Sequence, residues 1–250
     1  MSFVDAHCHL GSTAFDKDRQ EVLERMFAKG VNKGIMICCS EHDLLKACEI
    51  REKHPDLKLA IGIHPQDLET SYDQQRLTDL KDRISECHAD MIGEIGLDYY
   101  SHPHTREKQK QFFIAQLEMA RQLQLPVDIH SRKATADTQE ILKNYDLKTI
   151  IHSYSGSLET ARLYLNRGYY LSFGASVLFA KARRPAEVIA AIPLQRLLIE
   201  TDAPYQSPLR DQRHEPADVL KIYEAISRIR KISIEELERQ VENNFKEIFT

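Results

Sequence analysis

Eight short apolar runs, each followed by a segment with helical spacing, constrain the fold of this 250-residue chain more than any other feature. The runs are apolar at successive positions, which is typical of parallel strands buried on both faces. Eight βα units in a chain of roughly 250 residues close into a barrel. The runs span residues 3–5, 34–38, 57–63, 91–95, 126–129, 149–151, 169–173 and 197–199. The sequence therefore predicts an α/β fold, a (β/α)8 TIM barrel that forms a single domain over residues 1–250.

Capping patterns mark helices between these runs. Ser40 with Asp43 forms an N-terminal capping pattern, and Ser233 with Glu236 opens the last helix. An open, doubly wound sheet is the alternative fold. It is disfavoured because residues 7–11 read His-Cys-His-Leu-Gly, where that fold would have a glycine-rich phosphate turn.

Composition and charge exclude several classes of protein. Hydrophobic residues make up 42% and charged residues 29%, which argues against disorder. A formal net charge of −4 argues against a broad basic surface for duplex DNA but leaves room for a pocket that handles one phosphodiester. No apolar run reaches the ~18 residues of a membrane span, and no secretory signal is evident. We expect a cytoplasmic monomer with no membrane partner and five reduced cysteines.

Side chains that bind metals end five of the predicted strands. In a parallel barrel these positions share one rim, so residues distant in sequence converge there. Strand alternation also points both histidines of the first strand to the same face, with Asp5 one step below as a possible partner for a ligand imidazole. The candidate metal ligands are His7, His9, Glu94, His130, His152 and Asp202.

Each candidate taken singly also has a purely structural interpretation. A lone histidine at a strand end is more often a hydrogen-bonded core residue, and a buried arginine or lysine could neutralise Glu94. Together, six ligand groups exceed the needs of one tetrahedral ion. They suit two divalent ions roughly 3.5–4 Å apart that share a carboxylate. Mixed imidazole and carboxylate ligands favour Mg, Mn or Zn, with Fe also compatible, over Ca.

The segments that carry these residues resemble the TatD family of metal-dependent deoxyribonucleases, within the amidohydrolase superfamily. The matching segments are 5–10 (Asp-Ala-His-Cys-His-Leu), 62–65 (Gly-Ile-His-Pro), 93–99 (Gly-Glu-Ile-Gly-Leu-Asp-Tyr), 130–132 (His-Ser-Arg), 152–156 (His-Ser-Tyr-Ser-Gly) and 200–204 (Glu-Thr-Asp-Ala-Pro). The resemblance implies one metal site built by His7, His9, Glu94 and Asp202. It implies a second site built by Glu94, His130 and His152, with Glu94 bridging the two ions.

Two segments depart from the family pattern. Residues 213–216 read Arg-His-Glu-Pro where the family usually has Arg-Asn-x-Pro, so His214 replaces an asparagine. Ser153 and Tyr154 stand where Cys-Phe is usual. Neither change removes a ligand, so both bear on substrate preference rather than on catalysis.

The resemblance implies hydrolysis of phosphodiester bonds in DNA, as a 3′–5′ exonuclease on single strands or ends. Two metal ions and an activated water would carry out this reaction. Glu94 and Asp202 are the candidate catalytic residues. Asp202 is the candidate general base, although a role as ligand alone is nearly as well supported. The predicted substrate-binding residues are His64, Arg132 and Arg213, which would hold phosphate oxygens.

Further side chains are expected at the same rim. Basic residues in the loops after the strands predict a positive rim, in Lys133, Lys181, Arg183, Arg184 and Arg210. Aromatic residues could stack bases or pack at the rim, in Tyr99, Tyr154, Phe179 and Tyr205. The cysteines Cys8, Cys38 and Cys39 are expected to be small buried hydrophobes.

Two other functions fit the same residues. The site could cleave an ester or amide, such as an aminoacyl-tRNA ester, because fold does not dictate substrate. Alternatively, the barrel could bind metal without catalysis. The complete set of six ligands disfavours this second alternative.

Overall fold

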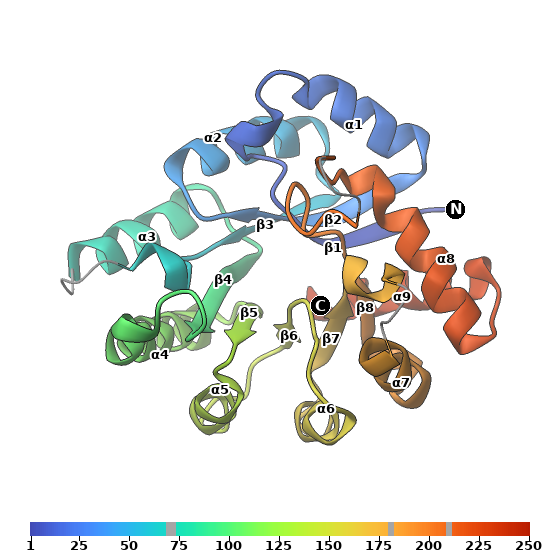
Figure 1. Cartoon of the computed structure of the whole chain (residues 1–250). Coiled ribbons are helices and arrows are strands. Elements are labelled where there is room, and N and C mark those ends of the chain that lie inside the picture. Colours follow the sequence, from blue (N-terminus) through green and yellow to red (C-terminus); the bar gives the residue numbers. More distant parts are fainter. Residues whose placement is uncertain (69–73, 180–182, 209–211) are drawn as a thin grey trace.

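An eight-stranded parallel sheet forms the centre of the computed structural model, which describes residues 1–68, 74–179, 183–208 and 212–250. The strands pair in chain order, and the helices surround them (Figure 1). The strands are β1 (Phe3–Cys8), β2 (Val31–Cys38), β3 (Leu57–Ile61), β4 (Met91–Asp98), β5 (Val127–Arg132), β6 (Thr149–Ile151), β7 (Tyr170–Phe173) and β8 (Leu197–Ile199). The predicted (β/α)8 barrel is confirmed.

Backbone hydrogen bonds next to the predicted ligands nearly close the barrel. Cys8 forms an isolated parallel bridge with Ala203, beyond the end of β8. The backbone N–H of Asp202 donates to the carbonyl of His7 at 2.9 Å, and that of His9 donates to the carbonyl of Ala203 at 2.7 Å. The ring is therefore joined at the point where the ligand candidates of the first and last strands meet.

Helices follow most strands, as the predicted βα units require. The helices are α1 (Arg19–Ala28), α2 (Glu41–Lys53), α3 (Gln74–Glu86), α4 (Arg106–Leu123), α5 (Thr135–Leu142), α6 (Leu158–Leu165), α7 (Arg183–Ala191), α8 (Val219–Arg230) and α9 (Ile234–Ile248). Short 3₁₀ turns lie at Thr13–Phe15, Pro65–Asp67, Pro103–Thr105, Ala175–Leu178, Leu194–Arg196 and Pro216–Asp218. The capping box of Ser40 and Asp43 is confirmed at the start of α2. Ser233 likewise caps α9 by accepting from the N–H of Glu236.

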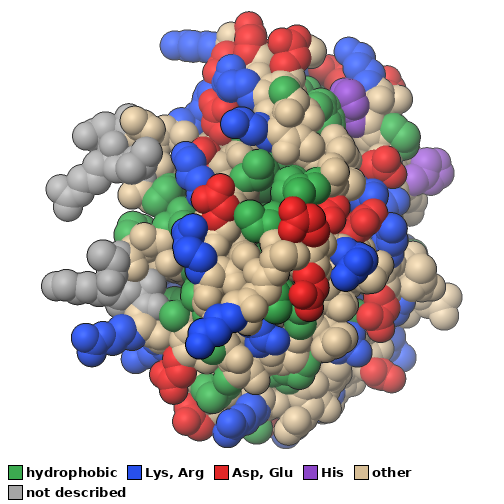
Figure 2. Space-filling view, turned by 90° about the vertical axis from the view of Figure 1, so that its right-hand side faces the viewer, with side chains coloured by type: hydrophobic (Ala, Val, Ile, Leu, Met, Phe, Trp, Pro, Cys, Tyr) green, Lys and Arg blue, Asp and Glu red, His purple; other side chains and the backbone are tan. Residues whose placement is uncertain are grey.

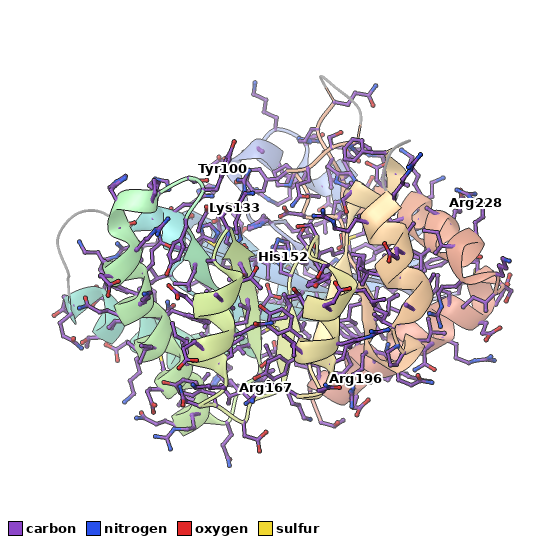
Figure 3. All side chains as sticks on the ribbon, turned by 60° about the horizontal axis from the view of Figure 1, so that its bottom comes forward. Tyr100, Lys133, His152, Arg167, Arg196 and Arg228 are labelled. Carbon is purple, nitrogen blue, oxygen red and sulfur yellow. The ribbon has the colours of Figure 1, made fainter. Side chains whose placement is uncertain are left out.

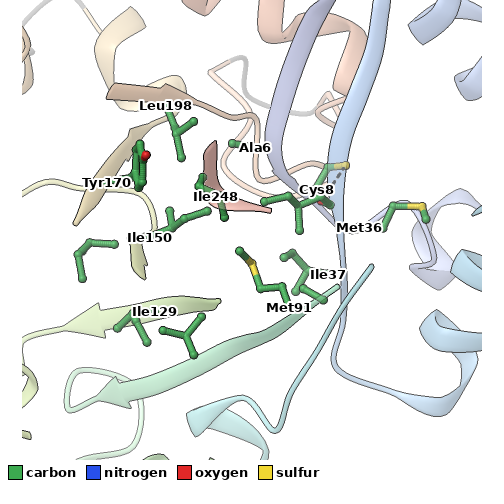
Figure 4. Packing of buried hydrophobic residues seen from close by; sticks show 14 of the residues in the cluster. Ala6, Cys8, Met36, Ile37, Met91, Ile129, Ile150, Tyr170, Leu198 and Ile248 are labelled. Atoms are coloured by element: carbon green, nitrogen blue, oxygen red, sulfur yellow. Dashed lines mark hydrogen bonds between the residues drawn. The ribbon is translucent and has the colours of Figure 1, made fainter. Parts of the chain in front are cut away.

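Apolar side chains from neighbouring strands fill the core. Figure 4 shows Ile37, Met91, Ile129 and Ile150 packed together, and each is fully buried. These residues come from β2, β4, β5 and β6, so the core links strands that are far apart in sequence. Burial of this kind stabilises the fold by about 25 cal/mol per Å² of apolar surface removed from water. The site above the core therefore rests on a rigid support.

The outer surface carries charges of both signs. Figure 2 shows the α8 side of the molecule, where acidic, basic and apolar side chains are mixed. This agrees with the modest net charge of −4. None of the helices in the described ranges combines the length and the apolar character that a membrane crossing requires.

A buried amide fastens the last helix to the last strand, which gives a test of the packing. The Nδ2 of Asn244 in α9 donates to the carbonyls of Leu194 and Leu197, both at 2.8 Å. We expect Asn244→Ala to lower the free energy of unfolding by about 2 kcal/mol, because two buried acceptors lose their donor. Urea denaturation measures the change. Asn243→Ala, at an exposed position of the same helix, is the control, and equal losses in both variants would contradict this role.

Candidate metal centre

The six predicted ligands lie at the carboxyl ends of the strands and meet around one point. His7 Nε2 lies 3.3 Å from His9 Nε2 and 3.5 Å from Glu94 Oε2. Across the barrel, His152 Nε2 lies 3.7 Å from Glu94 Oε1. Asp202 Oδ1 lies 3.3 Å from His9 Nε2. Four stretches of chain therefore contribute to this part of the cluster.

The side chains form three overlapping groups that can each hold a metal ion. In each group the potential ligand atoms lie within 4.8 Å of one another. The groups are His7 with Glu94 and His152, His7 with His9 and Asp202, and His64 with Glu94 and His130. Glu94 belongs to two groups and His7 to two. This overlap is what a shared carboxylate between neighbouring ions would require.

Glu94 is a buried carboxylate surrounded by imidazoles. Among the described residues, its ion-pair partners are His7, His64, His130 and His152, and none is an arginine or a lysine. Burial alone would raise the pKa of the Glu94 carboxyl, but the four imidazoles hold that pKa well below its usual range. The alternative in which a buried basic side chain neutralises Glu94 is therefore wrong for the part of the chain that is described.

The charges around the pocket favour a divalent cation. Five buried carboxylates gather there: Glu94, Asp98, Asp128, Glu200 and Asp202. Within the described ranges, the ion-pair partners of these carboxylates are all histidines. Buried negative charge without a cation is costly. Imidazole nitrogens and carboxylate oxygens are the donors that Zn, Mn and Mg accept, so the residues present fit a metal ion.

Further carboxylates orient the histidines from behind. Asp128 Oδ2 accepts from His7 Nδ1 at 2.8 Å, and Glu200 Oε1 lies 3.0 Å from His152 Nδ1. Asp98 Oδ2 lies 3.4 Å from His130 Nε2. Carboxylates in such positions fix the orientation of a ligand imidazole. Sequence reasoning did not assign Asp128 or Glu200 to this role.

The expectation that Asp5 orients a ligand imidazole is wrong. Its carboxylate accepts from the backbone N–H of Thr201 at 2.8 Å and from the Thr201 hydroxyl at 2.6 Å. Asp5 therefore joins β1 to the segment after β8 and does not contact an imidazole ring.

The sequence does contain a signal that could have identified Asp128, which is the single charged residue in the apolar segment 126–129.

The backbone is strained at the ends of three strands beside the cluster. Lys133, Ser153 and Asp202 have positive φ angles of 55°, 46° and 61°. Non-glycine residues reach this left-handed region at a cost of order 1–3 kcal/mol each, and such residues gather at functional sites. The turn at Asp202 places a predicted ligand at the junction between β8 and β1.

A cavity of about 650 Å³ opens above the cluster. Of the predicted substrate-binding residues, His64 and Arg132 line it. His64 Nε2 lies 3.6 Å from Glu94 Oε1, so His64 sits among the ligand candidates rather than at the rim. The guanidinium of Arg132 lies 4.1 Å from the centre of the Tyr100 ring.

The structure does not bring Arg213 to the cavity. Its guanidinium donates to Asp18 Oδ1 at 2.7 Å and to the carbonyl of Ala14 at 2.6 Å, and it lies over the Phe15 ring. Because these contacts use its donors, Arg213 holds the β1–α1 loop to the loop after β8. Lys181 and Arg210 fall outside the described residues, and the lining does not include Lys133, Arg183 or Arg184.

One of the four predicted stacking aromatics reaches the cavity. Tyr205 lines it and is 55% exposed, with its ring edge-on to His9. The hydroxyl of Tyr99 donates to Asp137 at 2.7 Å, and that of Tyr154 donates to the carbonyl of Ser157 at 2.6 Å. Both are buried packing residues, and Phe179 is exposed outside the lining. The sequence argument missed Tyr100, the exposed neighbour of Tyr99.

His214, which stands where the family usually has asparagine, contacts the loop that carries Tyr205. His214 is buried, and its Nδ1 lies 3.2 Å from the carbonyl of Tyr205. Burial lowers the pKa of His214. This side chain supports the loop after β8 and does not line the cavity.

The cysteines differ in their positions. Cys8 and Cys38 are buried as predicted, whereas Cys39 is half-buried and lines the cavity. Burial raises the pKa of the Cys39 thiol well above its usual range. Burial therefore disfavours a thiolate at Cys39.

Comparisons with known proteins agree with this site. A family model described as TatD related DNase matches residues 4–250. The chain is 35% identical over 250 residues to the uncharacterized metal-dependent hydrolase YabD of Bacillus subtilis, covering 98% of both chains. It is 30% identical over 265 residues to the human deoxyribonuclease TATDN3, covering 100% of this chain and 95% of that protein. The crystal structure of the TatD homologue YjjV of Escherichia coli superposes with a TM-score of 0.89 at 30% identity, covering 99% of this chain and 97% of that chain.

Fold and site together define a metal-dependent hydrolase built on a (β/α)8 barrel. The chain belongs to the TatD family, as the match across residues 4–250 establishes. The resemblance inferred from the sequence segments is confirmed.

The carboxylate behind His7 gives a test of the metal centre. We expect Asp128→Asn to weaken binding of Zn²⁺ or Mn²⁺ by about 10–100-fold, because the neutral amide no longer holds His7 as an oriented, basic ligand. Competition with a chelating dye measures the affinity. Asp82→Asn, at an exposed position in α3, is the matched control. Equal affinities in both variants would show that Asp128 does not orient a ligand.

Proposed function

We propose that this protein is a two-metal deoxyribonuclease that removes nucleotides from single-stranded DNA or DNA ends in the 3′–5′ direction. The observation that carries the proposal is the buried Glu94 carboxylate, which four imidazoles surround at the floor of an open cavity. Membership of the TatD family and the name of the human relative support DNA as the substrate. We also propose a monomeric enzyme, because the proposed ligand set is complete within one chain.

The proposed ligands form two sets that share one carboxylate. His7, His9, Glu94 and Asp202 would hold one ion, and Glu94, His130 and His152 would hold the other. In the structure His152 groups with His7 and Glu94, and His64 groups with Glu94 and His130. Divalent ions such as Mg, Mn or Zn, when bound, neutralise phosphoryl charge and lower the pKa of water. Glu94 would then act as a catalytic residue, because it belongs to both proposed sets.

Asp202 is the proposed general base. Its Oδ2 accepts from Gln206 Nε2 at 2.6 Å, and its Oδ1 faces His9. Burial acts to raise the pKa of this carboxyl, but contacts with His9, His152 and His7 outweigh burial and lower the pKa. The ionised carboxylate can accept a proton from an attacking water at the cavity floor.

Arg132 and His64 are the proposed grips on phosphate. Arg132 lies at the end of β5 and lines the cavity, where its guanidinium can donate to two phosphate oxygens at once. His64 Nε2 lies 3.6 Å from Glu94 Oε1, so His64 can contact a phosphoryl oxygen that binds beside Glu94. Arg213 has no part in this grip, because its donors serve Asp18 and the Ala14 carbonyl.

Ester hydrolysis is the second candidate function. The cavity lining includes Asp43 and Asp67, and such carboxylates suit the ammonium group of an aminoacyl ester. The same metal ligands and Asp202 would serve that reaction. DNA remains the first proposal because the family and the human relative point to it.

Incubation with labelled DNA tests the proposed activity. With Mg²⁺ or Mn²⁺ we expect stepwise shortening of a 5′-labelled single strand, and we expect EDTA to abolish it. Asp202→Asn should lower kcat at least about 100-fold, the lower range for loss of a general base, without loss of fold by circular dichroism. Hydrolysis of an aminoacyl ester without any shortening of DNA would replace this proposal by the second candidate.

The two arginines predicted to hold phosphate provide a further test. Arg132→Ala should raise KM for DNA about tenfold, as expected for loss of a charge-assisted hydrogen bond to phosphate. Arg213→Ala should leave KM unchanged and lower Tm, because it holds two loops together. Steady-state kinetics and thermal melting separate the two effects. A larger rise of KM in Arg213→Ala would reverse the assignment.

A further inference from the structure

Opposite sides of the cavity carry different chemistry. The loops after β2 and β3 contribute the carboxylates of Asp43 and Asp67, which we name the acidic arc. The end of β5 and the segments after β6 and β7 contribute one guanidinium and several hydroxyls, which we name the basic arc: Ser131, Arg132, Ser153, Ser155 and Ser176. Because the strands follow chain order around the barrel, the two arcs face each other across the metal centre (Figure 1).

Asp43 is held firmly at the acidic arc. It stands in the first turn of α2, where its Oδ2 accepts from the N–H of Ser40 at 3.2 Å. The backbone of Asp43 also packs against the β1–α1 loop, since a Cβ on Gly11 would lie 2.2 Å from the Asp43 carbonyl oxygen. The loop contact and the capping bond leave this carboxylate little freedom to move away from the cavity.

Asp67, Cys39 and Tyr205 share the space beside Asp43. Burial raises the pKa of the Asp67 carboxyl; the charges of His64 and Arg76 oppose this rise, and those of Asp43 and Glu94 add to it. The Tyr205 ring is T-shaped to the His9 ring with 5.1 Å between ring centres, and this exposed tyrosine lines the cavity. An aromatic face flanked by two carboxylates suits a nucleoside, whose base stacks and whose hydroxyl groups donate to the carboxylates.

The basic arc suits phosphates. The Arg132 guanidinium lies over Tyr100, whose ring is 62% exposed. Figure 3 shows Tyr100 and Lys133 at one end of the barrel above His152, while Arg167 and Arg196 lie at the other end. A strand whose bases stack near Tyr100 would have its phosphates next to Arg132 and the serine hydroxyls.

We propose that the pocket is directional and prefers a strand end that carries no terminal phosphate. The nucleotides still joined to the strand lie along the basic arc, and the terminal nucleoside lies against Tyr205 and the acidic arc. A terminal phosphate would face Asp43 and Asp67, and like charges in such a position repel strongly. The same repulsion disfavours a strand that continues past the site, in keeping with the exonucleolytic cleavage proposed above. This inference rests on the proposed deoxyribonuclease function.

The test compares two forms of one single-stranded oligonucleotide, with either a hydroxyl or a phosphate at the end that is degraded. For the wild-type protein we expect kcat/KM to be at least about tenfold higher for the hydroxyl form, which corresponds to ~1.4 kcal/mol. In the Asp43→Asn, Asp67→Asn double variant this ratio should fall to about one. Each single variant should give an intermediate ratio. Asp56→Asn, exposed in the turn before β3, should keep the wild-type ratio.

A binding measurement separates this inference from the proposed function. With EDTA present, fluorescence anisotropy should give a lower Kd for the hydroxyl form than for the phosphate form, and the double variant should remove the difference. Degradation of both forms at equal rates would overturn the inference while leaving the deoxyribonuclease proposal intact. If DNA is not degraded, the proposed function fails, and equal Kd values would then overturn the inference separately.

Discussion

The burial of the Glu94 carboxylate is the constraint on which the rest of the site depends. A negative charge in this position costs several kcal/mol unless positive charge surrounds it. Imidazoles from β1 and β5 and from the segments after β3 and β6 supply those contacts, and among the described residues no arginine or lysine does so. Because the fold brings histidines from several strand ends to one buried carboxylate, it also forms a site for a cation.

The contacts that close the barrel also position the ligands of the proposed metal site. The hydrogen bond from the Asp202 N–H to the His7 carbonyl joins the two ends of the sheet, and both residues are proposed ligands. Asp5 reinforces the junction through Thr201. Stability of the barrel and geometry of the site are therefore coupled at this junction.

Much of the architecture is predictable from the sequence because its signals are local. Eight apolar runs predict the strands, and histidines at strand ends predict the cluster through a property of all parallel barrels. The positions of Asp128 and Glu200 behind the ligands depend on side-chain packing between neighbouring strands, which spacing does not encode. Arg213 illustrates the opposite error, since its place in a basic loop predicts a phosphate grip while Asp18, far away in sequence, engages it.

Crystallography of the protein soaked with Mn²⁺, with anomalous data, tests the central claim most directly. The account predicts two anomalous peaks on the cavity floor, both next to the Glu94 carboxylate. One peak should lie among His7, His9 and Asp202, and the other should lie beside His130 and His152. Peaks elsewhere on the molecule, or a cavity floor without any peak at saturating Mn²⁺, would contradict the account.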